Sequence, residues 1–234
     1  VRNPDYWLSI NGRQLPYLDS MVYRPIPDET TRLAALAAGT TSAMESRRQA
    51  TVRDARALEG VTLYEFQGND AGGGHFNAQV APYDDVRVRR GLTLANNQEA
   101  VIEALGGAGI SEPVTQMFSK DSPWWSQAVA DAYPHFDFEA GTALLQEYGD
   151  DPSRSDGKAV GEKIHVDLAC PMDPTLVAAM SVLDQLCTAT GLVDVDVDTR
   201  NDPQTHINVS LGIANGLQGA HRAHSCTYTY LETQ

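Results

Sequence analysis

Apolar and polar residues alternate in the last third of the chain as a strand with one buried face requires. Residues 193–198 read Val-Asp-Val-Asp-Val-Asp, and residues 164–168 follow the same two-residue period. Between these segments, apolar side chains recur at helical spacing from Leu176 to Cys187, and Pro174 occupies the expected first helical position. This pattern predicts a strand–helix–strand unit with two parallel strands and an α/β fold.

Other helices are predicted where apolar residues recur at helical spacing, and residues 49–58 are predicted to be a charged helix. They cover residues 28–39, 49–58, 82–92, 96–106 and 137–149. Asn96 is the expected N-cap of the fourth and Asp137 of the fifth. Short strands are predicted at 21–26, 61–66 and 75–80. Loops are predicted at 69–74 and at 108–136. Trp124 and Trp125 are predicted to anchor the second loop, and the alternative is that they line a cleft.

Composition and charge narrow the class of protein. The 234 residues are 42% hydrophobic and 21% charged, which is typical of a folded globular protein. The net charge of -14 repels a phosphate backbone, so nucleic acid is excluded as an expected partner. No stretch approaches the roughly 18–20 apolar residues of a membrane-spanning helix. The three cysteines, Cys170, Cys187 and Cys226, leave the disulfide status open.

The sequence offers little catalytic chemistry. Gly72, Gly73 and Gly74 lack the spacing and the lysine of a phosphate-binding loop, and no Gly-x-Ser-x-Gly nucleophile motif occurs. We therefore expect neither an enzyme nor a bound cofactor.

Four segments occur in an order and at a spacing typical of one known family. They are residues 3–7 (Asn-Pro-Asp-Tyr-Trp), 23–39, 76–77 with 82–89 (Pro-Tyr-Asp-Asp-Val-Arg-Val-Arg), and 133–137 with 143–145. In these segments the chain resembles the family 5 extracytoplasmic solute-binding proteins of ABC importers, the dipeptide-, oligopeptide- and nickel-binding type. The resemblance implies a periplasmic-binding-protein-like fold of type II, in which two lobes with mixed sheets and flanking helices face a solute cleft. Asn77, Arg87 and Arg89 are predicted to hold the fold.

The same resemblance implies how the chain is divided and what it does. Residues 1–76 are expected in the first lobe and 77–234 in the second, with one crossing near His75. Because family members are considerably longer, the chain is expected to be an internal fragment. The implied function is capture of a peptide or similar polar solute by a monomer in the periplasm or another extracytoplasmic location. The solute would pass to ABC permease subunits in the membrane.

The stretch from residue 220 to 228 resembles the family strand that contacts solute. Arg222 matches an arginine of oligopeptide-binding members, and its planar guanidinium suits a ligand carboxylate, although a surface arginine is the alternative. Ser225 replaces the family tryptophan. Tyr228 stands about where the family aspartate pairs with the peptide amino terminus, so the amine clamp departs from the usual pattern. The predicted ligand-binding residues are Arg222, Ser225, Cys226, Tyr228 and His75.

A metal site is the alternative reading of this stretch. His221, His224 and Cys226 place three possible nickel or zinc ligands within six residues. Residues 221 and 224 would lie on opposite faces of an ideal strand, so solvated histidines compete with this interpretation. The alternative function is accordingly a metal-binding protein or a metalloenzyme.

Overall fold

The computed structural model describes residues 3–46, 48–65, 73–116, 118–172, 174–201 and 224–227. The chain divides into two compact units, residues 1–44 and 45–234. Compactness alone does not locate a solute cleft, so the lobe boundary near residue 76 stays a prediction. No helix among the described residues is long and apolar enough to cross a membrane.

The first unit contains a small hairpin and one helix. Strands β1 (Ser9–Ile10) and β2 (Arg13–Gln14) pair antiparallel, and helix α1 spans Glu29–Ala37. The helix begins as predicted, because the Asp28 carboxylate accepts a hydrogen bond from the Thr31 N–H at 2.7 Å. Gly39 follows the helix with φ of 70°, a left-handed conformation that glycine adopts without strain.

The strand predicted at residues 21–26 was wrong. These residues are in no strand, and the side chains of Val22 and Tyr23 are 76% and 85% exposed. A strand needs a neighbour that satisfies its N–H and C=O groups, and this unit's described residues place only the short β1–β2 pair in strands. The apolar pattern by itself does not supply that neighbour.

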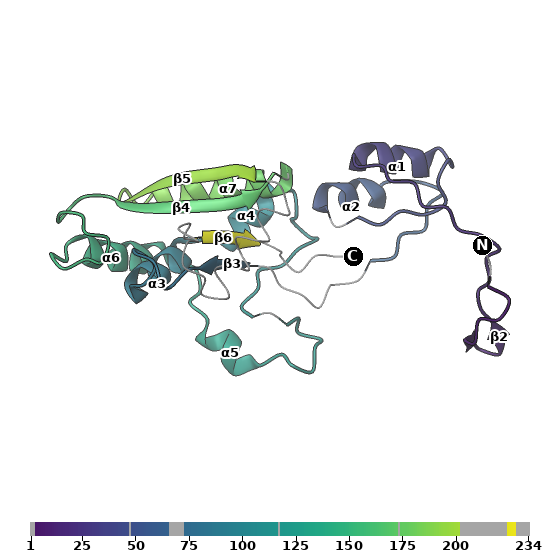
Figure 1. Cartoon of the computed structure of the whole chain (residues 1–234), viewed down its shortest axis with the longest axis horizontal. Helices are drawn as coiled ribbons and strands as arrows, with labels where there is room; N and C mark the ends of the chain where they lie inside the picture. The colour runs from purple at the N-terminus through teal and green to yellow at the C-terminus, as the bar shows by residue number, and fades with distance from the viewer. Residues whose placement is uncertain are drawn as a thin grey trace. The chain divides into compact units, whose positions relative to one another are not determined.

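The second unit is built on a mixed sheet (Figure 1). Its strands are β3 (Gly73–Phe76), β4 (Ile164–Pro171), β5 (Val193–Asn201) and β6 (His224–Thr227), in the order β3-β6-β4-β5. Strands β4 and β5 are parallel and joined by helix α7 (Pro174–Thr188), which confirms the predicted strand–helix–strand unit. Strand β6 is parallel to β4 and antiparallel to β3.

Helix α7 packs against β4 and β5, and three further helices complete the core. Helices α3 (Val86–Ala95) and α4 (Gln98–Ala104) contact α7, and α6 (Phe138–Gly149) packs against α3. Their apolar side chains join the inward residues of β4 and β5 in one buried cluster, which includes Val88, Val101, Leu145, Ile164 and Met180. Helix α2 (Gln49–Arg56) belongs to the same unit, with Gln49 Nε2 donating to Ser111 Oγ at 3.3 Å.

Several local predictions need correction. The N-cap of α4 is Asn97, whose side chain accepts from the Ala100 N–H at 3.1 Å, while Asn96 ends α3. Residues 61–65 are in no strand, and residues 73–74 form part of β3 where a loop was predicted. The predicted loop at 108–136 contains the short helix α5 (Gln127–Ala132).

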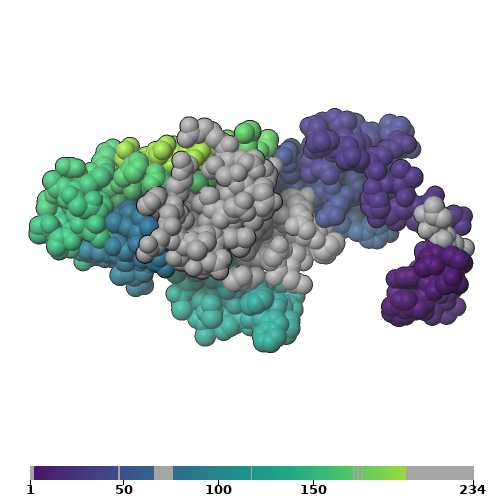
Figure 2. All heavy atoms as spheres, viewed as in Figure 1, coloured from purple at the N-terminus to yellow at the C-terminus, as the bar shows by residue number. Residues whose placement is uncertain are grey.

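The segment from 108 to 136 is held by two glutamine side chains. The Gln98 amide accepts from the Val114 N–H at 2.8 Å and donates to the Val114 carbonyl at 3.1 Å. Gln116 makes the same pair of bonds to Ser126, at 3.0 and 2.9 Å. Trp124 is 74% exposed, so its predicted anchoring role was wrong. The segment is the teal projection of the second unit in Figure 2.

Three motif residues serve the fold as predicted. Arg87 binds Asp85 at 2.6 Å and Asp151 at 2.9 Å, which joins the start of α3 to the end of α6. Arg89 donates to the Tyr83 carbonyl at 2.6 Å. The Asn77 side chain accepts from the Gln79 N–H at 3.2 Å, which closes the turn after β3.

The Arg87 network makes stability depend on pH. Hydrogen bonds from the Ser153 hydroxyl and N–H, together with Arg87, lower the pKa of Asp151 to about 2. Since this value lies below the ordinary value of about 4, the charged carboxylate stabilises the fold above pH 4, and this contribution is lost as pH falls toward 2. Thermal melts should therefore show a smaller loss of stability between pH 4 and pH 2 in Asp151→Asn than in the unmodified protein. Identical losses would refute the assignment.

Candidate functional site

The structure brings part of the predicted site together in two neighbouring strands. His75 of β3 lies directly opposite Ser225 of β6 in the register, and Gly74 lies opposite Cys226. These positions are about 150 residues apart in sequence and meet only through antiparallel pairing. The predicted residues Arg222 and Tyr228 lie outside the described part of the chain. The ligand-binding roles of all five residues stay predictions.

The register continues as a row across the whole sheet. Ser225 of β6 pairs with Ala169 of β4, and Ala169 pairs with Asp198 of β5. The row therefore runs His75, Ser225, Ala169, Asp198 in the spatial order of the strands. It lies near the carboxyl ends of β4 and β5, the edge at which open α/β sheets bind ligands.

Asp198 is the member of this row that sequence reasoning missed. Alternation predicted a solvated face for the aspartates of β5, and Asp194 and Asp196 are exposed as expected. Asp198, however, is only 9% exposed. Periodicity assigns residues to a face but does not show what covers one end of it, so no sequence signal could have singled out this carboxylate.

Tyr83 fixes the sheet beside the row. Its side chain is fully buried, its ring stacks on Phe76 with centroids 5.7 Å apart, and its hydroxyl accepts from the Asp167 N–H at 3.1 Å. Burial, with a smaller contribution from the Asp167 charge, raises the pKa of the phenol above its ordinary value. Tyr83 therefore stays neutral.

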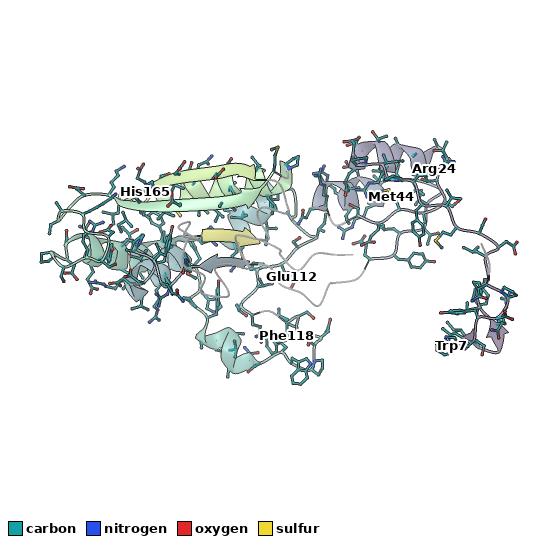
Figure 3. All side chains as sticks on the ribbon, in the orientation of Figure 1. Trp7, Arg24, Met44, Glu112, Phe118 and His165 are labelled. Atoms are coloured by element: carbon teal, nitrogen blue, oxygen red, sulfur yellow. The ribbon has the colours of Figure 1, made fainter. Side chains whose placement is uncertain are left out.

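The outer face of β4 and β5 carries a separate polar cluster. His165, labelled in Figure 3, has its Nε2 3.1 Å from Asp167 Oδ1 and its Nδ1 3.7 Å from Asp194 Oδ2. Asp167 lies opposite Asp196 in the register, so two like charges face each other across the strands.

The described residues do not support the alternative function, a metal-binding protein or metalloenzyme. Within it, no group of three or more His, Cys, Asp or Glu side chains could hold a metal ion. His221 lies outside those residues, as do the side chains of His224 and Cys226. Cys187 lies in the core, where burial raises the pKa of its thiol to about 12, so it remains an unreactive thiol.

Comparison with known proteins decides the family. The sequence profile of the bacterial extracellular solute-binding proteins, family 5 (middle part), matches residues 1–220. The chain belongs to this family.

Two curated proteins show how the family 5 chain relates to longer members. The dipeptide-binding protein of Escherichia coli K12 is 31% identical over 135 residues, which are 57% of this chain and 24% of that protein. Heme-binding protein A of Haemophilus influenzae is 37% identical over 112 residues, 47% of this chain and 20% of that protein. The matched region thus spans about a quarter or less of either relative's length.

A solved structure establishes the fold of this family 5 chain. The periplasmic binding protein DppA from Helicobacter pylori, solved in complex with a peptide, superposes with a TM-score of 0.71 at 17% sequence identity. The match covers 96% of this chain and 38% of the neighbour. The α/β fold of type II periplasmic binding proteins, predicted from the sequence, is confirmed.

Proposed function

We propose that the protein captures short peptides in a cleft between two lobes and delivers them to an ABC permease in the membrane. It acts outside the cytoplasm, as a monomer, and performs no chemistry on its solute. Family membership supports solute capture. The observation that carries the site is the register pair His75–Ser225, which joins two predicted ligand-binding residues from distant parts of the sequence.

The direction of the paired strands supports a two-lobe mechanism. Strand β3 carries the chain into the sheet of the second unit, and β6 runs beside it in the opposite direction. We infer that the chain crosses between lobes along β3, near His75 as the sequence predicts, and that it crosses a second time along the adjacent β6, which the sequence did not predict. Two adjacent crossings form a hinge about which lobes can close on a solute, so that binding becomes a change of shape that a transporter can sense.

Among the solutes that appear in the relatives' names, we favour peptides. One curated relative is named for dipeptides, and the Helicobacter neighbour was solved with a peptide bound. Arg222 supports the choice, since a guanidinium binds a carboxylate through two parallel hydrogen bonds. The other curated relative is named for heme. Heme is therefore one competing ligand in the experiment. Metal ions are the other, because a metal site is the alternative interpretation of the sequence.

A thermal-shift and calorimetry panel tests this function on the full-length protein. The probes are alanyl-alanine, alanyl-phenylalanine, alanyl-lysine, tetra-alanine, hemin, Ni²⁺ and Zn²⁺. At least one peptide should stabilise the protein saturably, by about 2.7 kcal/mol at a concentration 100 times its Kd. Arg222→Ala should weaken binding of that peptide. Mass spectrometry should recover the bound peptide intact. Binding of hemin or a metal ion alone, or cleavage of the peptide, would contradict the proposal.

A further inference from the structure

Tyr83 contacts two strands of the sheet. One is β3, which contains His75 of the predicted site, and the other is β4, which pairs with Ser225 of β6. Its ring stacks on Phe76, the last residue of β3, which directly follows His75. Its hydroxyl accepts from the Asp167 N–H at 3.1 Å and donates to the Asp167 carbonyl at 3.4 Å. Asp167 lies in β4, two residues before the Ala169–Ser225 pair.

These two strands are not neighbours in the sheet, because β6 lies between them. One side chain that contacts both β3 and β4 limits the space available to β6 and therefore limits how far the β3–β6 pair can shift. Tyr83 is itself held in place, since Arg89 of α3 donates to its carbonyl at 2.6 Å. A fully buried residue with these contacts connects the β3–β6 pair to β4, and we call this role a brace.

We propose that Tyr83 is a positioning residue for solute binding. It holds the β3–β6 pair against β4 and so keeps His75 and Ser225 where a solute meets them. The proposal rests on the proposed function, because it assigns Tyr83 an effect on solute affinity. Tyr83 does not touch the solute, since its side chain has no exposed surface.

Tyr83→Phe in the full-length protein tests the brace. Phenylalanine keeps the ring stack on Phe76 and removes only the hydroxyl that binds Asp167. Amide hydrogen exchange should become faster at residues 73–76 and 224–227. Affinity should fall by on the order of threefold or more for whichever panel peptide binds the unmodified protein most tightly.

Tyr133→Phe is the matched control. The Tyr133 hydroxyl accepts from Gln98 Nε2 at 3.2 Å, so the control removes one hydroxyl hydrogen bond from the same unit at a site away from β3 and β6. The two variants are compared under conditions in which their unfolding free energies are equal. Under these conditions Tyr133→Phe should leave peptide affinity and amide exchange in β3 and β6 unchanged. Equal effects of the two variants, or unchanged peptide affinity in Tyr83→Phe, would overturn the proposal.

A second variant covers the case in which Tyr83→Phe does not fold. Phe76→Leu keeps the Tyr83 hydroxyl but removes the ring stack, and it should give the same faster exchange and weaker binding. If no peptide binds the unmodified protein, the proposed function fails, and exchange in β3 and β6 alone decides whether Tyr83 is a brace. Exchange unchanged by Tyr83→Phe would then overturn the brace as well.

Discussion

Arg154→Met should lower the free energy of unfolding by about 3–5 kcal/mol. The Arg154 side chain is completely buried, and its guanidinium binds both oxygens of the Asp156 carboxylate at 2.7 Å. It also donates to the Glu162 carbonyl at 2.8 Å and lies over the Tyr148 ring at 5.0 Å. Methionine fills much of the volume but leaves the Asp156 carboxylate without its cation in a site that water scarcely reaches.

The expected loss of unfolding free energy is large because Arg154 stabilises the charged form of the Asp156 carboxylate. Burial by itself would raise the pKa of Asp156, but the hydrogen bonds and charge of Arg154, with help from the Lys158 N–H, lower it instead. Urea denaturation of the full-length protein measures the loss. Arg53→Met is the control, because the Arg53–Asp54 pair is more than half exposed and should contribute at most about 1 kcal/mol. Equal losses in the two variants would contradict the assigned role of Arg154.

Gly141→Ala should cost about 1–3 kcal/mol of unfolding free energy. Helices α3 and α6 cross at Gly91 and Gly141. A Cβ on Gly141 would lie 2.8 Å from the Gly91 carbonyl oxygen and 2.9 Å from the Ala95 nitrogen. Both are backbone atoms, so the clash is relieved only by moving the helices apart and opening the core between them.

The same helix supplies a control of opposite sign. Gly149 ends α6, and a Cβ added there would meet no atom within 4 Å. Gly149→Ala should therefore raise stability by up to about 1 kcal/mol, because alanine loses less conformational entropy on folding. Chemical denaturation compares the two variants. A loss of stability in Gly149→Ala that matches Gly141→Ala would show that the close helix crossing is not the cause.

The structural roles of Tyr83, Arg154 and Gly141 concern one body of the protein, the sheet and its helices in the second unit. Arg154 and Gly141 stabilise the helical layer, whereas Tyr83 joins the layer to the strands of the predicted site. The variants therefore separate two properties. Arg154→Met and Gly141→Ala should change stability with little effect on the affinity of the folded protein, while Tyr83→Phe should change both.

The sequence alone was enough for features that depend on a few neighbouring residues. The helix start at Asp28, the Asp137 cap, the strand–helix–strand unit and the family resemblance were all predicted correctly. A cap needs only a side chain within three residues of an N–H, and alternation needs only a single strand with one buried face. The isolated apolar runs at 21–26 and 61–65 failed because a strand also needs a partner.

Tertiary structure alone decided which distant residues meet. The row from His75 through Ser225 and Ala169 to Asp198 depends on three strand pairings, and a shift of one residue in any of them would change its members. Burial of Asp198 and the glutamine bonds of the 108–136 segment depend on long-range packing in the same way. Local propensity acts over a few residues, whereas register is set by the fit of whole elements, so the sequence determined the elements and the packed sheet determined the site.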